Sequence, residues 1–265
     1  MGVLNVTPDS FSDGGSYLDP QAAIARGRQM AEEGADLIDI GGESTRPGAA
    51  LVPLDVERAR VLPVIQGLAG ALRIPLSVDT SKAAVAEAAV AAGASIVNDV
   101  TALGDPEMAG VVVRSNAALI LMHMRGTPQT MQRRPRYHDV VQDVARELAE
   151  AAAHAEAAGI ARTRLLLDPG LGFGKTVAHN LQLLQHLEAL VALGYPVVVG
   201  PSKKSFIGRV LEAEVDDRLA GTLACVAAAF RHGAAVVRVH EVRPAVQFLT
   251  MLQAIERPDA AWRER

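Results

Sequence analysis

Polar side chains that can bind a ligand or ionise recur in this sequence at one kind of position, directly after a short apolar run. Asp79, Asn98 and Asp168 each follow residues with the pattern of a short buried strand. The complete series is Asn5, Asp39, Asp79, Asn98, His123, Asp168, Ser202, Arg238 and His240. A polar residue can end any strand, but so many of them in order indicate a shared polar pocket at one edge of a sheet.

The acids and the amide of this series suit one kind of ligand. The carboxylates of Asp79 and Asp168 and the amide of Asn98 can form paired hydrogen bonds with a flat, nitrogen-rich heterocycle.

Lysine is used sparingly, and always at or just after the predicted end of a strand. The four lysines are Lys82, Lys175, Lys203 and Lys204. With Arg46, Arg238 and His240 they predict a cationic rim around the pocket, on a chain whose net charge is −4. Such a rim suits a small anionic substrate that carries phosphate or diphosphate.

Two long connections follow the first two predicted strands. Residues 7–16 and 41–49 are rich in glycine, proline and small hydroxyl side chains. Loops of this composition offer backbone N–H groups to anions, and two of them on adjacent strands favour lids over an active site.

Several common catalytic centres do not fit this sequence. It contains one cysteine, Cys225, and no cluster of cysteine and histidine that would predict zinc. It has neither a GxGxxG nor a Walker motif, and no convincing Ser-His-Asp spacing. The amide of Asn5, together with loop oxygens, can hold Mg²⁺, which keeps most of its waters and bridges a diphosphate.

Short apolar runs alternate with longer amphipathic segments, and this alternation predicts the elements that must position these residues. Strands are expected at Gly2–Asn5, Leu37–Ile40, Leu76–Val78, Ser95–Asn98, Ala118–Met122, Leu165–Asp168, Val197–Val199 and Val236–Val239. Helices are expected most clearly at Pro20–Glu33, Leu54–Leu72, Lys82–Ala92, Asp139–Ala158, Asn180–Leu193, Arg218–His232 and Arg243–Ile255. Eight strands with helical connections in 265 residues predict an α/β fold, a (β/α)8 TIM barrel formed by residues 1–265 as a single domain. The alternative is an open doubly wound sheet.

Composition narrows the class of protein further. Hydrophobic residues make up 49% of the sequence and charged residues 21%, which indicates a folded core. Aromatic residues make up only 3%, and the chain has no excess of positive charge, so nucleic acid is not an expected partner. No apolar run is long enough to span a membrane and no signal peptide is visible, so no membrane contact is expected. The single cysteine fits a reducing cytoplasm.

Several segments resemble the dihydropteroate synthase family of the folate pathway. The longest matches are residues 5–15, NVTPDSFSDGG, and residues 41–48, GGESTRPG. Shorter matches follow in order: SVDT at 77–80, VND at 97–99, LMHM at 121–124, DPGLGFGK at 168–175, SKKS at 202–205 and RVH at 238–240. The resemblance therefore covers nearly the whole chain.

The resemblance implies a transferase that joins 6-hydroxymethyl-7,8-dihydropterin diphosphate to 4-aminobenzoate and releases 7,8-dihydropteroate and diphosphate. It also implies a homodimer and a sulfonamide target, with Mg²⁺ as cofactor and Asn5 at the metal. Asp79, Asp168 and Lys204 would be catalytic. The pterin would be held by Asp79, Asn98, Asp168 and Lys204, the diphosphate by Arg238 and His240, and the aminobenzoate by Thr45, Arg46, Pro47, Phe173 and Ser205.

Two positions depart from the pattern of that family, and two other functions fit part of the sequence. Lys203 stands where the family commonly has arginine, and Glu241 where it usually has aspartate. A corrinoid-type pterin methyltransferase would share the barrel and the pterin pocket but would not need a diphosphate rim. A pterin-binding paralogue without turnover is the second alternative; the intact segment 42–47 argues against it, and an assay separates the two.

Overall fold

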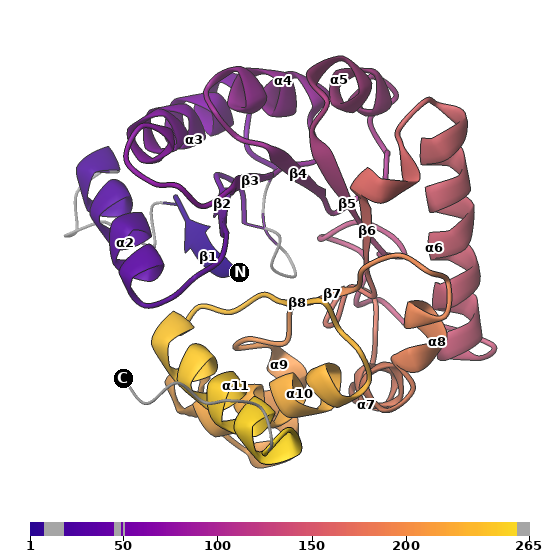
Figure 1. Ribbon diagram of the computed structural model, residues 1–265. Helices are drawn as coiled ribbons and strands as arrows, with labels where there is room; N and C mark the ends of the chain where they lie inside the picture. Colours follow the sequence, from indigo (N-terminus) through magenta and orange to yellow (C-terminus); the bar gives the residue numbers. More distant parts are fainter. Residues whose placement is uncertain (8–18, 45–48, 50, 259–265) are drawn as a thin grey trace.

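The structure, a computed structural model, describes residues 1–7, 19–44, 49 and 51–258 and shows a ring of strands surrounded by helices (Figure 1). The strands are β1 (Gly2–Asn5), β2 (Ile38–Gly41), β3 (Leu76–Asp79), β4 (Ile96–Asp99), β5 (Ala118–Met122), β6 (Leu165–Asp168), β7 (Val198–Val199) and β8 (Val236–Val237). The first six form one parallel sheet in chain order, and β7 and β8 form a parallel pair.

Two isolated bridges join the sheet to the pair and close the barrel. Leu167 of β6 bridges Val197, and Gly2 of β1 bridges Val239, both in parallel. The backbone N–H of Val3 donates to the Val239 carbonyl at 2.9 Å across the second junction. The α/β TIM barrel expected from the sequence is therefore confirmed, and the open doubly wound alternative is wrong.

The helices form the outer layer of the barrel, and most lie where the periodicity predicts them. They are α2 (Pro20–Glu32), α3 (Leu54–Ala69), α4 (Ala83–Ala91), α5 (Met108–Ser115), α6 (Val140–Ala157), α7 (Val177–Gln185), α8 (Glu188–Val191), α9 (Ser205–Leu211), α10 (Leu219–Arg231) and α11 (Val242–Glu256). Two 3₁₀ turns, η1 (Arg162–Arg164) and η2 (Val215–Asp217), complete the elements.

Two differences from the expected helices have a local cause. The segment Asn180–Leu193 forms α7 and α8 rather than one helix, because the backbone leaves helical geometry at His186. The short helices α5 and α9 are not among the clearest predicted helices, since eight and seven residues give too few turns for a clear apolar period.

The strand register sets the height at which each polar side chain leaves the barrel. Asn5 pairs with Gly41, Gly41 with Asp79, and Asp79 with Asn98, so these four residues stand side by side at one level. Met122 pairs with Asp168 on the other side of the ring. Because all strands are parallel, these residues share the C-terminal face of the barrel, where TIM-barrel enzymes carry their active sites.

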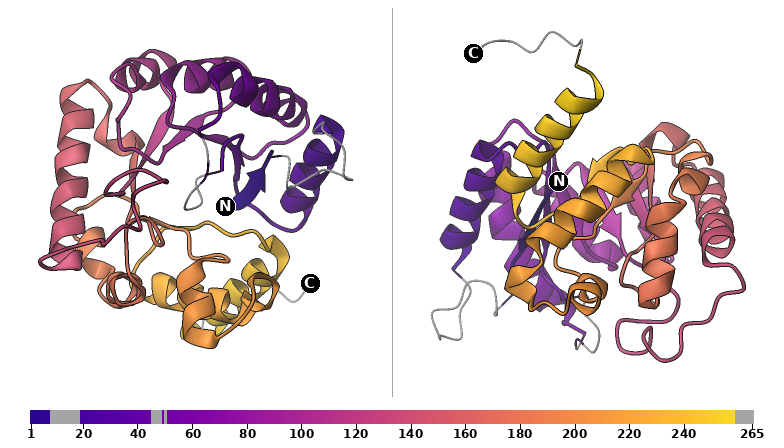
Figure 2. Two further views of the ribbon diagram at one scale, coloured as in Figure 1. Left: turned by 180° about the vertical axis from the view of Figure 1, so that it is seen from behind. Right: turned by 90° about the horizontal axis from the view of Figure 1, so that it is seen from below.

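The views from behind and from below show the helices packed around the outside of this ring (Figure 2). Within the described part of the chain, no helix is both long and apolar enough to cross a membrane.

Candidate active site

The C-terminal ends of the strands surround a recess whose polar side chains come from five parts of the chain. Its lining comprises Asp79, Asn98, Val100, Met122, Asp168, Gly170, Leu171, Phe173, Gly200, Lys204 and Arg238. The polar members come from β3, β4, β6, the segment before α9 and the end of β8. Six residues that the sequence assigns to substrate therefore meet in one place.

The recess is narrow, with a free volume of about 20 Å³. Small-molecule pockets usually enclose about 300–1,000 Å³. A ring the size of a pterin must therefore displace side chains that now line the recess.

Arg238 stands at the centre of a buried cluster of charge. Its guanidinium donates to Asp39 Oδ2 from Nε at 2.7 Å and lies 2.7 Å from Asp79 Oδ2. The Nδ2 of Asn98 donates to the same Asp39 oxygen at 3.0 Å. Asp39 is fully buried and does not line the recess, yet it holds two residues that do.

Asp39 lies at the end of a predicted strand, but its position in the sequence does not predict its role. The available signal was an acid between two isoleucines, since an acid in a buried strand needs a partner for its charge.

The two acids of the recess are both held in surroundings that favour the neutral form. Burial raises the pKa of Asp79 to about 7, although the Arg238 charge opposes the rise. Burial also raises the pKa of Asp168, opposed by a hydrogen bond from the Gly170 N–H to Oδ1 at 2.7 Å. Buried carboxyl groups with shifted pKa values are typical of binding and catalytic sites.

Lys204 covers the other side of the recess. Its Nζ lies 4.1 Å from the centre of the Phe173 ring, a distance at which an ammonium is attracted to an aromatic face. A side chain at Gly172 would meet Lys204 Cδ at 3.1 Å, so the glycine-rich loop after β6 leaves room for this lysine.

Three other sequence-predicted residues that the structure describes lie outside the lining of the recess. Asn5 ends β1, Ser205 is exposed at the first position of α9, and His240 follows β8 with its Nδ1 2.9 Å from the Ser202 hydroxyl. Thr45, Arg46 and Pro47 lie outside the described residues.

The prediction that all four lysines form a cationic rim is wrong for three of them. Lys82 pairs with Glu43 and Glu57, Lys203 pairs with Glu241 at 2.7 Å, and Lys175 is buried against His123. An ammonium beside a carboxylate or inside the protein does not present its charge to a substrate. Only Lys204 reaches the recess, because chain position fixes the height of a side chain but not its neighbours.

The cluster around Lys82 holds the base of the second long loop. The Glu43 carboxylate accepts from the Val52 N–H at 2.9 Å and binds the Lys82 ammonium, which also binds the buried Glu57 of α3. Burial lowers the pKa of Lys82, but hydrogen bonds to the two glutamates outweigh it and raise the pKa, so the lysine stays charged.

The two departures from the family pattern contact each other. Lys203 Nζ lies 2.7 Å from Glu241 Oε1. Lys203 has a left-handed backbone (φ 59°), its N–H donates to Thr222 Oγ1 at 3.4 Å, and its carbonyl accepts from Arg218. This pair therefore sits directly beside Lys204 in the chain without entering the recess.

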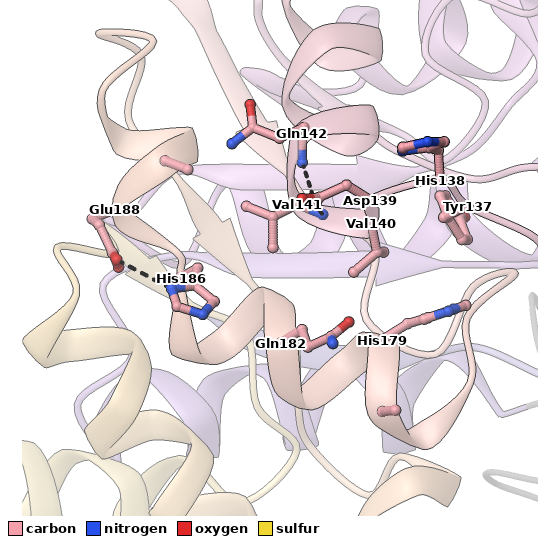
Figure 3. A pocket seen from close by; sticks show the side chains of 12 residues that line it. Tyr137, His138, Asp139, Val140, Val141, Gln142, His179, Gln182, His186 and Glu188 are labelled. Carbon is pink, nitrogen blue, oxygen red and sulfur yellow. Dashed lines mark hydrogen bonds and ion pairs between the residues drawn. The ribbon is translucent and has the colours of Figure 1, made fainter.

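A larger cavity of about 750 Å³ lies outside the barrel, between the start of α6 and the α7–α8 segment (Figure 3). Its walls include His138, His179 and His186, the last facing Glu188 across 3.7 Å. None of the sequence-predicted site residues lines it. Size alone therefore does not locate the chemistry in this barrel.

Comparisons with known proteins agree with the geometry. A family model described as pterin binding enzyme matches residues 1–240. Dihydropteroate synthase of Escherichia coli is 44% identical over 254 residues, 96% of this chain and 90% of the relative.

Solved structures give the same result. Xanthomonas albilineans dihydropteroate synthase with 4-aminobenzoic acid superposes with a TM-score of 0.92 and 50% identity, over 97% of this chain and 92% of that one. Yersinia pestis dihydropteroate synthase in a sulfonamide drug complex superposes with a TM-score of 0.92 and 45% identity, over 97% and 93%.

The family expected from the sequence motifs is thus confirmed, with the transferase activity that defines it. The chain belongs to the dihydropteroate synthase family of pterin-binding enzymes, which act in folate biosynthesis.

Proposed function

We propose that this chain joins 6-hydroxymethyl-7,8-dihydropterin diphosphate to 4-aminobenzoate, with release of 7,8-dihydropteroate and diphosphate. The observation that carries the proposal is the convergence of Asp79, Asn98, Asp168, Lys204 and Arg238 on one recess at the C-terminal face of the barrel.

The pterin ring binds in this recess through its edge. Asp79, Asn98 and Asp168 offer carboxylate and amide groups to the N–H donors and ring acceptors of a flat heterocycle. Val100, Met122 and Phe173 supply apolar surface for its faces. This combination of a few polar groups in an apolar wall is typical of small-molecule sites.

The reaction exchanges one bond for another at the pterin methylene carbon. The amine nitrogen of 4-aminobenzoate forms the new C–N bond, the C–O bond breaks, and its electron pair leaves with diphosphate. The amine then loses a proton to solvent. In their ionised forms, Asp79 and Asp168 stabilise the positive charge that develops on the ring, an effect that is strong in a site shielded from water.

Diphosphate competes with two carboxylates for Arg238. The guanidinium is bound to Asp39 and Asp79 in the structure. Guanidinium binds phosphate oxygens through paired hydrogen bonds, so a diphosphate above the recess can draw it away from Asp79. Lys204 adds a second positive charge on this side of the site, and His240 offers its imidazole to the diphosphate.

The aminobenzoate site lies on the Lys204 side, beside Phe173 and Ser205, with Thr45, Arg46 and Pro47 of the second loop. The Glu43 carboxylate binds the Val52 N–H and the Lys82 ammonium, so residues on either side of segment 45–48 are held together. Sulfonamides resemble 4-aminobenzoate in shape, so we expect them to raise the apparent KM for 4-aminobenzoate.

Asn5 is suited to be the one protein ligand of Mg²⁺. Its amide is half-buried at the C-terminal end of β1, at the level of Asp79, and no hydrogen bond from another described residue engages it. Mg²⁺ commonly binds proteins through one or two oxygen groups and completes its shell with water and phosphate. When bound, the ion would neutralise charge on the departing diphosphate.

We also propose that residues 1–265 form one domain, and that the enzyme works as a cytoplasmic homodimer. Four exposed apolar side chains, Val210, Leu211, Val215 and Leu219, lie on consecutive segments from α9 to α10 and support an interface between copies. Light scattering on the purified protein should give the mass of two chains.

The test of the activity is an assay with both substrates and Mg²⁺. We expect diphosphate and dihydropteroate in equal amounts, and no diphosphate release when 4-aminobenzoate is left out. Tight pterin binding without product at saturating substrates would reject the synthase and favour the non-catalytic alternative.

A further inference from the structure

Behind the recess lies a buried lysine that the proposed reaction does not use. Lys175 is 3% exposed, and its Nζ has three partners: His123 Nδ1 at 2.9 Å, the Phe173 carbonyl at 3.0 Å and the His123 carbonyl at 3.3 Å. An ammonium has three N–H donors, so every donor of Lys175 finds an acceptor.

His123 continues this network toward the outside of the barrel. Because its Nδ1 accepts from Lys175, the ring proton resides on Nε2, which donates to Glu147 of α6 at 2.9 Å. Burial and the Lys175 charge lower the pKa of His123 to about 4, so the ring is neutral at pH 7. Burial favours the neutral form of Glu147, but hydrogen bonds from Arg125 and His123 lower its pKa to about 2.

The loop after β6 is pressed onto the end of β5 at this point. Gly170 has a left-handed backbone (φ 64°), and a Cβ there would lie 2.0 Å from the His123 carbonyl oxygen. Gly174 is also left-handed (φ 61°), and its Cβ would lie 2.8 Å from the Arg125 carbonyl oxygen. Only glycine permits these approaches, and Lys175 binds both sides of the contact.

This loop carries two groups of the recess. Its first residue after Pro169 donates the N–H that binds Asp168, and Phe173 lies under the Lys204 ammonium. The Phe173 carbonyl is itself held by Lys175. A change at Lys175 is therefore transmitted to both groups through the backbone of five residues.

We propose that Lys175 is a positioning residue for the substrate site: with His123 and Glu147 as its support, it fixes the loop that presents Asp168 and Phe173 to the recess. The inference rests on the proposed function and adds to it a residue that touches no substrate.

The charge of Lys175 also reaches the recess. It is one of three cations, with Lys204 and Arg238, that oppose the rise in the pKa of Asp168 caused by burial. Burial lowers the pKa of Lys175 itself to about 7, against the raising effect of Asp168 and Glu147, while Lys204 and Arg125 add to the lowering. Proton loss from Lys175 above neutral pH leaves two N–H donors for three acceptors and removes a positive charge from behind Asp168.

The first experiment compares Lys175→Met with the wild-type enzyme and with Arg146→Met. Methionine keeps the length of the side chain but removes its charge and donors. Arg146 contacts Glu147 from an exposed position on α6, so its loss perturbs the network without reaching the loop. Kinetics are measured from pH 6 to 9, below the melting temperature of each variant.

We expect Lys175→Met to lower kcat/KM by about 100-fold, the loss typical of a reacting group displaced by about 1 Å. KM should rise for both substrates. In the wild type we expect kcat/KM to fall above pH 7, as Lys175 loses its proton, and this fall should be absent in the variant. Arg146→Met should keep wild-type kinetics. Unchanged KM values with an unchanged pH profile, even with a lower melting temperature, would reduce Lys175 to a packing residue and overturn the inference.

A second variant and a measurement on the intact protein cover the case in which Lys175→Met does not fold. His123→Gln keeps one acceptor and one donor, and we expect it to retain more activity than His123→Leu. Because the chain has four lysines, ¹³C-lysine NMR can follow Lys175 directly, assigned by single lysine-to-arginine variants. We expect the Lys175 signal to shift when a pterin binds. An unchanged chemical shift would contradict the inference.

These readouts separate the inference from the proposed function. A wild-type enzyme without turnover rejects the function, whereas calorimetric titration of a pterin into wild type and Lys175→Met still decides the positioning role. Equal affinities would overturn it, and weaker binding by the variant would support it.

Discussion

Two clusters of side chains beside the recess, each with members that line it and members that lie behind them, use charge in opposite ways; we call them the acidic wall and the braced wall. The acidic wall, formed by Asp39, Asp79, Asn98 and Arg238, directs its charges toward one another at the mouth of the barrel. The braced wall, formed by His123, Glu147, Asp168 and Lys175, turns most of its charges away from the recess into a network that ends at α6.

This difference separates binding from support. On the acidic wall, a ligand can replace one partner of Arg238, so the charges rearrange when substrate enters. On the braced wall, Lys175 donates to two backbone carbonyls and to His123, so its hydrogen bonds hold the loop after β6 in place. The walls should therefore respond differently to substitution: the first through turnover, the second also through stability and its pH dependence.

The largest effect is expected on the acidic wall, from Asp79→Asn. The change removes a carboxylate that stabilises charge in the transition state, and kcat should fall by about 10²–10³-fold. Product formation is measured beside Asp36→Asn, an exposed acid at the opposite end of β2, which should keep full activity. Near-normal turnover by Asp79→Asn would remove this residue from the site.

The second-largest effect is expected on the braced wall, as a loss of folding stability at acid pH. His123 is neutral in the folded protein down to about pH 4 but protonates near pH 6.5 when unfolded. Between these values the unfolded chain binds the extra proton, so stability falls as pH drops from 6.5 to 4, by up to about 3 kcal/mol from this group.

Denaturant unfolding at pH 7 and pH 4.5 measures this loss. His123→Gln cannot titrate and should lose less stability between the two values than the wild type. Replacement of the exposed His154 by glutamine is the matched control and should leave the difference unchanged. Equal losses in all three proteins would show that His123 is not held neutral by this wall.

A smaller effect is expected from Asp39→Asn, which weakens the support of Arg238 but leaves its contact with Asp79. One hydrogen bond to a charged group is worth about 1.5–3 kcal/mol; because the Arg238 contact with Asp79 remains, we expect the lower end of that range, a fall in kcat/KM of about tenfold. The loss should appear mainly in KM for the pterin diphosphate. A loss as large as that of Asp79→Asn would place Asp39 in contact with substrate.

The smallest effect is expected at the rim, from exchanging the pair Lys203 and Glu241 for arginine and aspartate. The pair is about one-third exposed on each side, and ion pairs of this kind contribute about 0–1 kcal/mol. A double-mutant cycle on the free energy of unfolding should give a coupling below about 1 kcal/mol. A change in kcat larger than twofold would connect this pair to Lys204 and to the acidic wall.

Much of the site could be predicted from local features of the chain. Asp79, Asn98 and Asp168 follow buried strand patterns, and parallel strands in a barrel bring such positions to one face. The same reasoning placed Lys82, Lys175 and Lys203 on that face but gave them the wrong surroundings. Glu57, which binds Lys82, comes from a helix 25 residues earlier, and Glu241 lies 38 residues after Lys203.

The sequence by itself determined the alternation of strands and helices, hence the barrel, and the set of polar residues at its C-terminal face. Tertiary structure alone decided which charges meet. The ionisation of Asp79, Lys175 and His123 depends on distances of a few ångströms between strands and on how much water is excluded there. Spacing along the chain determines neither quantity, because the interacting residues come from different strands, loops and helices of the barrel.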